Sequence, residues 1–242
     1  QGMLRQDDHR HHISERFNSE LEGIKNQLLE MGGKVEKQLN AAVAALIAGD
    51  TGEAEEIINR DHEVNQMEMR IDEECSTIIA RRQPTASDLR LVMTVIKVNT
   101  DIERIGDEAA KIARQGIRLA QENVSATNYI EVRHIGSHVA SMLRKALDAF
   151  ARLDLDLAVE VVKEDADVDK EYGSAMRSLV TFMMEDPRDI GAILNEMWAL
   201  RSLERIGDHA ANIAEHVVYL VRGQDVRHQK TLEEFIDKAA GN

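Results

Sequence analysis

The 242-residue sequence is poor in the residue types that build β-sandwiches, disulfide scaffolds and membrane spans. Aromatic residues make up 3% of it, only two prolines occur, and the Val-, Tyr- and Phe-rich runs typical of strands are missing. The single cysteine, Cys75, excludes an internal disulfide framework and suits a reducing compartment. No stretch approaches the ~20 uninterrupted apolar residues of a bilayer span, and no signal peptide is visible. We therefore expect a helical, cytoplasmic protein without membrane insertion.

Positive charge is scarce as well. The chain has 30 Lys and Arg residues against 44 Asp and Glu residues, which gives a formal net charge of −14. Nucleic-acid binding needs a basic surface because it neutralises phosphates, so we expect no nucleic-acid partner. An excess of carboxylates suits a protein that binds cations or a partner with a basic surface. The 43% of hydrophobic residues is enough to build a core.

The most informative feature of the sequence is an eleven-residue segment that occurs twice. Residues 103–113 read Glu-Arg-Ile-Gly-Asp-Glu-Ala-Ala-Lys-Ile-Ala, and residues 204–214 read Glu-Arg-Ile-Gly-Asp-His-Ala-Ala-Asn-Ile-Ala. Similarity continues upstream at a shift of 104 residues, where Asp61 corresponds to Asp165. Pro84 and Pro187 are 103 residues apart. Because an internal repeat determines the architecture, we predict a duplicated unit of about 100 residues.

Each unit has the apolar periodicity of three helices. We expect helices over 14–48, 52–82 and 87–122 in the first unit, and over 128–152, 156–185 and 188–222 in the second. Short connections, including the turns at Pro84 and Pro187, make neighbouring helices antiparallel. The prediction is an all-α fold of two tandem antiparallel three-helix bundles, covering residues 14–123 and 124–223. Residues 1–13 are interpreted as a tag remnant and disordered tail, and residues 224–242 as a C-terminal tail.

Both copies of the repeated segment carry two carboxylates one helical turn apart. Glu103 and Asp107 share a helix face, as do Glu204 and Asp208. The surrounding apolar residues centre about 150° away on the helical wheel, so the acids should point outward. The glycine between them, Gly106 or Gly207, predicts close helix–helix approach.

The proline turns indicate which residues lie opposite these acids. Counting away from each turn along the two antiparallel helices brings further oxygen-bearing side chains level with the acidic pairs. The expected partners are Asp61 with Asp107, Asn65 with Glu103, Asp165 with Asp208, and Asp169 with Glu204.

Clustered carboxylates need a counter-charge, and a bound metal ion is the strongest one available. All-oxygen ligands suit hard ions such as Mg²⁺, Mn²⁺ and Ca²⁺, and iron is compatible with them. We therefore interpret the eight residues as ligands of divalent or trivalent ions (iron, manganese, magnesium or zinc). The alternative is a solvated acidic face on which Arg104 and Arg205 form ion pairs.

The sequence resembles the PhoU family over about residues 14–223. The segments Ile102 to Asp107 and Leu203 to Asp208 match the family's doubled Glu-x-x-x-Asp signature. The resemblance implies a cytoplasmic, homodimeric regulator of phosphate uptake that carries multinuclear metal clusters on its surface. It also implies contacts with the ATPase of the phosphate ABC transporter and with the phosphate-sensing histidine kinase. Through them such a protein represses the phosphate-starvation genes, without being an enzyme.

Two other functions stay open on the sequence alone: a carboxylate-bridged metalloenzyme and a metal-free structural interaction module. The first needs Glu-x-x-His pairs that project into a bundle core, and neither repeat has that spacing. The two sites are also expected to differ, because Glu68 and Asp72 continue the acidic stripe of the first unit whereas Tyr172 and Met176 replace them in the second.

We expect structural rather than functional roles for two histidine residues, the cysteine and the tryptophan. His134 and His138 are one helical turn apart, as in helical zinc sites, but surface histidines are the favoured interpretation. Cys75 and Trp198 are expected to pack in the bundle core.

Overall fold

The computed structural model describes residues 2–122 and 127–223, with side chains from residue 15 onward. Over these ranges the chain forms helices and no strand, which confirms the predicted all-α class. A short 3-10 turn, η1 (Pro187–Asp189), precedes the last helix. The predicted C-terminal tail and most of the link between the units lie outside the described residues. The six helices are α1 (Gly2–Ala48), α2 (Thr51–Arg82), α3 (Ala86–Gln121), α4 (Ile130–Arg152), α5 (Leu155–Glu185) and α6 (Ile190–Arg222).

The ends of α2 and α5 follow from local sequence signals that the repeat preserves. The Asp50 side chain accepts a hydrogen bond from the backbone N–H of Glu53 at 3.0 Å, and Asp154 accepts one from Leu157 at the same distance. Each aspartate thereby satisfies one of the free N–H groups at a helix start. The turns at Pro84 and Pro187 then end the two helices where the sequence predicted.

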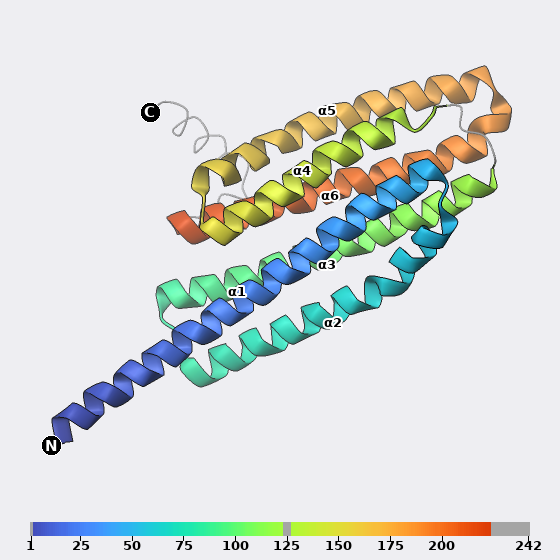
Figure 1. Cartoon of the computed structure of the whole chain (residues 1–242). Coiled ribbons are helices and arrows are strands. Elements are labelled where there is room, and N and C mark those ends of the chain that lie inside the picture. Colours follow the sequence, from blue (N-terminus) through green and yellow to red (C-terminus); the bar gives the residue numbers. More distant parts are fainter. Residues whose placement is uncertain (1, 123–126, 224–242) are drawn as a thin grey trace, which may run out of the picture.

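The start of α1 differs from the prediction. The sequence analysis placed it near residue 14 and expected a disordered tail over 1–13, but α1 begins at Gly2. The prediction is corrected for residues 2–13, which continue the helix. Adding a residue to an existing helix brings one hydrogen bond per residue ordered, so a long packed helix extends past its last core contact more easily than a new one begins. Figure 1 shows this part of α1 projecting beyond the other helices.

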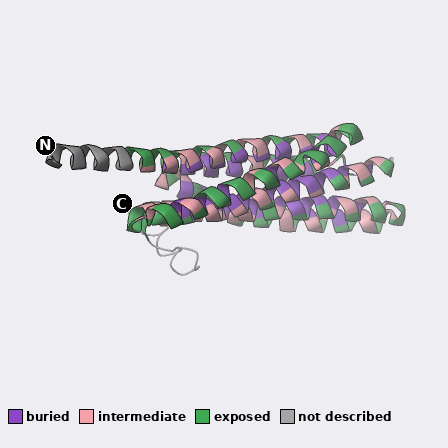
Figure 2. Cartoon of the chain, turned by 90° about the horizontal axis from the view of Figure 1, so that it is seen from below, coloured by how far each residue is buried: buried purple, intermediate pink, exposed green. Residues whose placement is uncertain are grey.

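The two units join along α3 and α6. These helices run antiparallel and pack against each other, α1 and α2 cover α3, and α4 and α5 cover α6 (Figure 1). α1 also packs on α4, whereas α2 and α5 lie on opposite edges. Figure 2 shows buried residues concentrated on the inward sides of the helices. Within the described ranges, none of the helices combines the length and apolarity needed to cross a membrane.

Close approach of the helices occurs at glycines other than those of the repeated motif. A Cβ on Gly116 would lie 3.1 Å from the Leu46 Cα, so α3 touches the backbone of α1 there. A Cβ on Gly106 would lie 3.4 Å from the nearest atom, a methyl of Val64, which is an ordinary contact. The motif glycine is therefore buried but leaves room for one methyl group.

Substitution of these two glycines should have opposite effects. Gly116→Ala is expected to destabilise the protein by about 1–3 kcal/mol, because the backbone of α1 cannot yield as a side chain can. Gly106→Ala should be neutral or stabilise by up to ~1 kcal/mol, because alanine favours helix over glycine. Urea denaturation of both variants and the parent measures the difference. Equal destabilisation by the two would contradict the packing described here.

Candidate functional site

The predicted acidic residues lie along the lines where α2 meets α3 and where α5 meets α6. In the second unit, one oxygen each of Asp165, Asp169 and Asp208 lie within 4.8 Å of one another. Glu204 stands one turn before Asp208 on α6, and its side chain is largely buried. These four residues, here called the second acidic cluster, were predicted from the sequence to meet.

Burial and mutual repulsion disfavour the ionised state in the second acidic cluster. Burial, followed by the charges of Asp169 and Glu204, raises the pKa of Asp165 to about 6. Burial, followed by Asp165 and Asp169, raises the pKa of Asp208 to about 6. The pKa of Glu204 is raised by burial and by Asp208. A cation placed among these groups would reverse the effect, because it favours their charged form.

In the first unit we call the three predicted carboxylates Asp61, Glu103 and Asp107 the first acidic cluster. Burial and the charge of Asp107 raise the pKa of Asp61, and burial with the charges of Asp107 and Asp61 raises that of Glu103. Glu68, on the same stripe of α2, also has a raised pKa, owing to burial and to Glu103. Asn65 is exposed on α2 and makes no hydrogen bond among the described residues.

One oxygen in each cluster has an environment that suits a metal ligand. The Oδ1 atoms of Asp61 and Asp165, which correspond in the repeat, are both buried and have no hydrogen-bond partner among the described residues. Buried polar atoms are nearly always paired, so such an atom needs an explanation. A hard cation would supply the missing interaction at both positions.

The two clusters differ in which carboxylate a protein cation contacts. In the first unit, Lys111 Nζ lies 2.9 Å from Asp107 Oδ2. The corresponding residue in the second unit is Asn212, which turns away and donates to Asp101 at 3.3 Å. Among the described residues Asp208 thus has no lysine partner, and the second acidic cluster is paired instead through Glu204, whose Oε2 lies 3.3 Å from Arg201 Nη1.

A buried polar cluster between the units was not predicted from the sequence. The carboxylate of Asp101, on α3, contacts His209 Nδ1 at 2.9 Å and His216 Nε2 at 3.2 Å, both on α6. Burial alone would raise the pKa of Asp101, but the hydrogen bonds from His209 and His216 outweigh it and hold the pKa below its usual value. Nearby, Arg205 Nε on α6 lies 3.3 Å from the buried Glu108 on α3.

A signal for this interface was present in the repeat. The two copies of the eleven-residue segment differ at two positions only, Glu108 against His209 and Lys111 against Asn212. Glu108, His209 and Asn212 belong to the contacts between α3 and α6. Three of the four divergent residues thus lie where α3 packs on α6, whereas Lys111 contacts Asp107 and Glu108 of its own helix.

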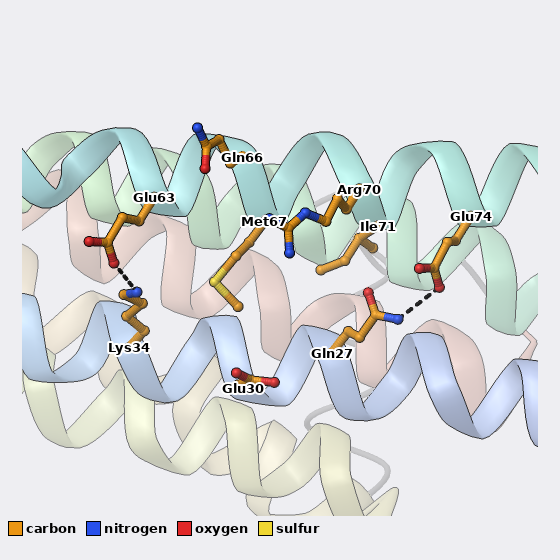
Figure 3. A pocket seen from close by; sticks show the side chains of 9 residues that line it. All are labelled: Gln27, Glu30, Lys34, Glu63, Gln66, Met67, Arg70, Ile71 and Glu74. Carbon is orange, nitrogen blue, oxygen red and sulfur yellow. Dashed lines mark hydrogen bonds and ion pairs between the residues drawn. The ribbon is translucent and has the colours of Figure 1, made fainter.

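A hollow of about 460 Å³ lies between α1 and α2, away from the two acidic clusters. Figure 3 shows it between the Lys34–Glu63 ion pair and the hydrogen bond from Gln27 to Glu74, which measures 2.8 Å. Arg70 also lines it. Its residues of α2 are on the helix face opposite to Asp61, so the hollow is separate from the first acidic cluster.

Three minor predictions have mixed outcomes. His138 lies between Glu164 at 3.2 Å and Glu171 at 3.0 Å, and these contacts link α4 to α5. Cys75 is buried, as expected, and burial raises its pKa to about 12. Trp198 was expected in the core, and that prediction is wrong, because its side chain is 61% exposed. Periodicity alone did not reveal that this position of α6 has no neighbouring helix over it.

Comparison with known proteins agrees with the arrangement of paired three-helix units and acidic motifs. The PhoU domain model matches the chain twice, over residues 28–116 and 132–217. The chain belongs to the PhoU family. A PhoU homolog of Pseudomonas aeruginosa, named a phosphate-specific transport system accessory protein, is 60% identical over 93% of both chains. The accessory protein PhoU of Escherichia coli is 48% identical over 90% of both.

Solved PhoU structures share the fold. The crystal structure of PhoU from Pseudomonas aeruginosa covers 86% of this chain and all of its own, with a TM-score of 0.84 and 60% identity. The phosphate transport system regulatory protein PhoU from Streptococcus pneumoniae covers 88% of this chain with a TM-score of 0.81 and 31% identity. Both agree with the predicted duplicated architecture.

The raised pKa values of Asp165 and Asp208 predict a pH-dependent stability of the metal-free protein. In the native state these carboxyls hold protons up to about pH 6, whereas unfolded aspartate releases them near pH 4. The contribution of these two groups to stability should therefore fall as the pH rises from about 4 to 6, and stay level above that.

Urea denaturation in the presence of a chelator, at several pH values between 4 and 7, measures this contribution. Relative to the parent, Asp165→Asn/Asp208→Asn should gain stability as the pH rises through this window. Asp167→Asn, on the exposed side of α5, is the matched control and should follow the parent curve. A constant difference between the double variant and the parent at every pH would contradict the assigned pKa values.

Proposed function

We propose that this member of the PhoU family is a metal-binding regulatory adaptor of a phosphate transport system. The observation that carries the proposal is the repeated pair of acidic clusters, in which Asp61 and Asp165 each hold a buried oxygen without a hydrogen-bond partner among the described residues. The names of the relatives, which are accessory or regulatory proteins of phosphate transport, support the regulatory part.

The metal ions would be held by the two clusters separately. Carboxylate and amide oxygens suit a hard divalent or trivalent ion, such as manganese, magnesium or iron, and zinc also accepts carboxylates. When bound, the ion supplies positive charge among groups that otherwise repel one another. The ligands would be Asp61, Asn65, Glu103 and Asp107 in the first unit, and Asp165, Asp169, Glu204 and Asp208 in the second.

The proposed partners are the ATPase subunit of the phosphate ABC transporter and a phosphate-sensing histidine kinase. The net charge of −14 favours proteins with a basic surface over nucleic acid. The protein would act in the cytoplasm as a homodimer, and it would repress the phosphate-starvation genes through these contacts rather than through catalysis. Metal occupancy would set the charge of the face formed by α2, α3, α6 and α5, and hence the partner surface.

Removal of the motif carboxylates should abolish metal binding. After chelation and reloading with Mn²⁺, Mg²⁺ or Fe²⁺, elemental analysis should find metal in the parent and not in the variant Glu103→Gln/Asp107→Asn/Glu204→Gln/Asp208→Asn. At a metal concentration 100 times the Kd, the parent gains ~2.7 kcal/mol, or roughly 5–10 °C in Tm.

Asp167→Asn is again the matched control and should keep both the metal and the thermal shift. A parent protein that binds none of these ions would overturn the metal assignment and favour a structural interaction module. Oxidase activity of the iron-loaded parent would favour the metalloenzyme instead.

Partner binding should depend on metal. In pull-downs, the metal-loaded parent should retain the transporter ATPase and the kinase more strongly than the chelated protein, and the fourfold motif variant should match the chelated protein. In cells, the same variant should lose repression of the phosphate-starvation genes. Equal retention by all three samples, with repression intact, would refute a role of the metal in regulation.

A further inference from the structure

Two histidines of α4 and two glutamates of α5 meet where these helices pack together. His134 Nε2 lies 3.5 Å from Glu171 Oε2, and His138 Nδ1 lies 3.0 Å from Glu171 Oε1. The other ring nitrogen of His138, Nε2, lies 3.2 Å from Glu164 Oε2. We call these four residues the histidine cluster. On α5, Glu171 points about 160° away from Asp169, so the histidine cluster is separate from the second acidic cluster.

The ring of His138 faces a carboxylate on both sides. A neutral imidazole carries one N–H group, so one of its two nitrogens presents a lone pair. A carboxylate oxygen is also an acceptor, and two acceptors at about 3 Å repel each other. A cation has to lie at one of these contacts, and it is either a second proton on the ring or a metal ion.

The surroundings of Glu171 favour the metal ion. Lys145 Nζ lies 2.6 Å from Glu164, so that carboxylate already has a permanent positive charge beside it. Among the residues that the structure describes, Glu171 forms ion-pair contacts with His134 and His138 alone. Two imidazoles and one carboxylate without a lysine or arginine therefore converge on one place. These are the ligand types of zinc sites.

The distances also suit a tetrahedral ion. Ligands held by zinc at ~2.0–2.2 Å in tetrahedral directions lie ~3.3–3.5 Å from one another. The two nitrogen–oxygen distances at Glu171, 3.0 and 3.5 Å, are close to this spacing. The side chain of His134 is 64% exposed, so its ring can turn toward an ion held by His138 and Glu171. Histidines one helical turn apart are the spacing of helical zinc sites.

Glu164 has the place of a positioning residue. Metal-binding histidines commonly donate their second N–H to a carboxylate, which fixes the orientation and the tautomer of the ring. Glu164 lies at His138 Nε2 and would accept this hydrogen bond while Nδ1 binds the ion. The ion pair with Lys145 holds Glu164 in place.

The first unit shows that the fold does not require the histidine cluster. At the shift of 104 residues, Lys34 corresponds to His138 and forms an ion pair with Glu63 across α1 and α2 (Figure 3). Met67 corresponds to Glu171. An ordinary ion pair is thus enough to link the first two helices of a unit, and the second unit differs in carrying metal-ligand chemistry at the same place.

We propose that the histidine cluster binds one transition-metal ion of the zinc class through His134, His138 and Glu171, with a fourth position open to water. Imidazole ligands favour Zn²⁺, Co²⁺ and Ni²⁺, whereas Mg²⁺ and Ca²⁺ prefer ligands that are all oxygen. The protein would therefore bind a second class of metal, apart from the hard ions proposed for the two acidic clusters. The ion would cross-link α4 to α5 on the side of α5 that faces away from α6.

The binding test needs a background without competing sites. His9, His11 and His12 near the N-terminus are all changed to Gln, because neighbouring histidines also take up zinc. The substitutions Glu103→Gln/Asp107→Asn/Glu204→Gln/Asp208→Asn are then added to remove the motif carboxylates. Calorimetric titration of this protein with Zn²⁺ should show one bound ion, and titration with Mg²⁺ should show none.

Substitution locates the ion. In that background, His134→Gln/His138→Gln should weaken zinc binding at least ~10-fold, the loss that even an outer-shell partner brings. The single change His134→Gln, at an exposed side chain, should weaken it as well without affecting folding. His62→Gln, at an exposed histidine of α2, is the matched control and should change the affinity less than ~2-fold. Equal affinity of the double variant and its background would overturn the proposal.

Nitrogen NMR of the histidine rings identifies the ligands directly and in protein with intact motifs. Zinc should move His138 Nδ1 and one nitrogen of His134 to metal-bound shifts, and leave the proton on His138 Nε2. Glu164→Gln should weaken zinc binding ~10-fold and change the Nε2 resonance, which a purely structural role would not move. Two doubly protonated rings that excess zinc leaves unchanged at neutral pH would overturn the proposal in favour of ion pairs.

The metal assignments of the two kinds of site can fail separately. Zinc bound by the fourfold motif variant, together with no Mn²⁺, Mg²⁺ or Fe²⁺ bound by the parent, would leave the histidine cluster standing and remove the acidic sites. Zinc lost in the fourfold motif variant but kept in His134→Gln/His138→Gln would place zinc in the acidic clusters and refute the histidine cluster.

Discussion

The antiparallel packing of α3 against α6 is the contact on which the rest of the molecule depends. It turns two three-helix units, each with one apolar side left open, into one six-helix body with α3 and α6 at its centre. The same contact buries the Asp101 carboxylate among His209, His216 and Asn212, so charge as well as shape fixes the register of the two helices. Each acidic cluster takes its motif pair from one of these two helices, Glu103 and Asp107 from α3 and Glu204 and Asp208 from α6, so the relative position of the clusters follows from that register.

The helices and the two acidic clusters could be predicted from the sequence, because the clusters depend on contacts within each helical hairpin. Pro84 and Pro187 mark the turns, and equal counts on either side of a turn bring residues of antiparallel helices level. That reasoning placed Asp61 beside Asp107 and Asp165 beside Asp208. Apolar periodicity gave the helices to within two residues, except at the start of α1, which no turn or proline marks.

The sequence reasoning failed where the contact joins helices that no turn connects. No turn joins α3 to α6, so counting residues from a turn could not give their register. The cluster around Asp101 therefore could not be predicted from the sequence. Trp198 was misplaced for a related reason: a helical wheel identifies an apolar side but not whether another helix covers it.

The divergence of the two repeated segments has a consequence for how such a protein could assemble. In a pairing of two identical first units, Asp101 would meet Glu108, Lys111 and Gln115 where it now meets His209, Asn212 and His216. In a pairing of two second units, the buried histidines would face Ser202 and lack their carboxylate. Each half has thus become the specific complement of the other. The two halves are therefore not interchangeable at this contact.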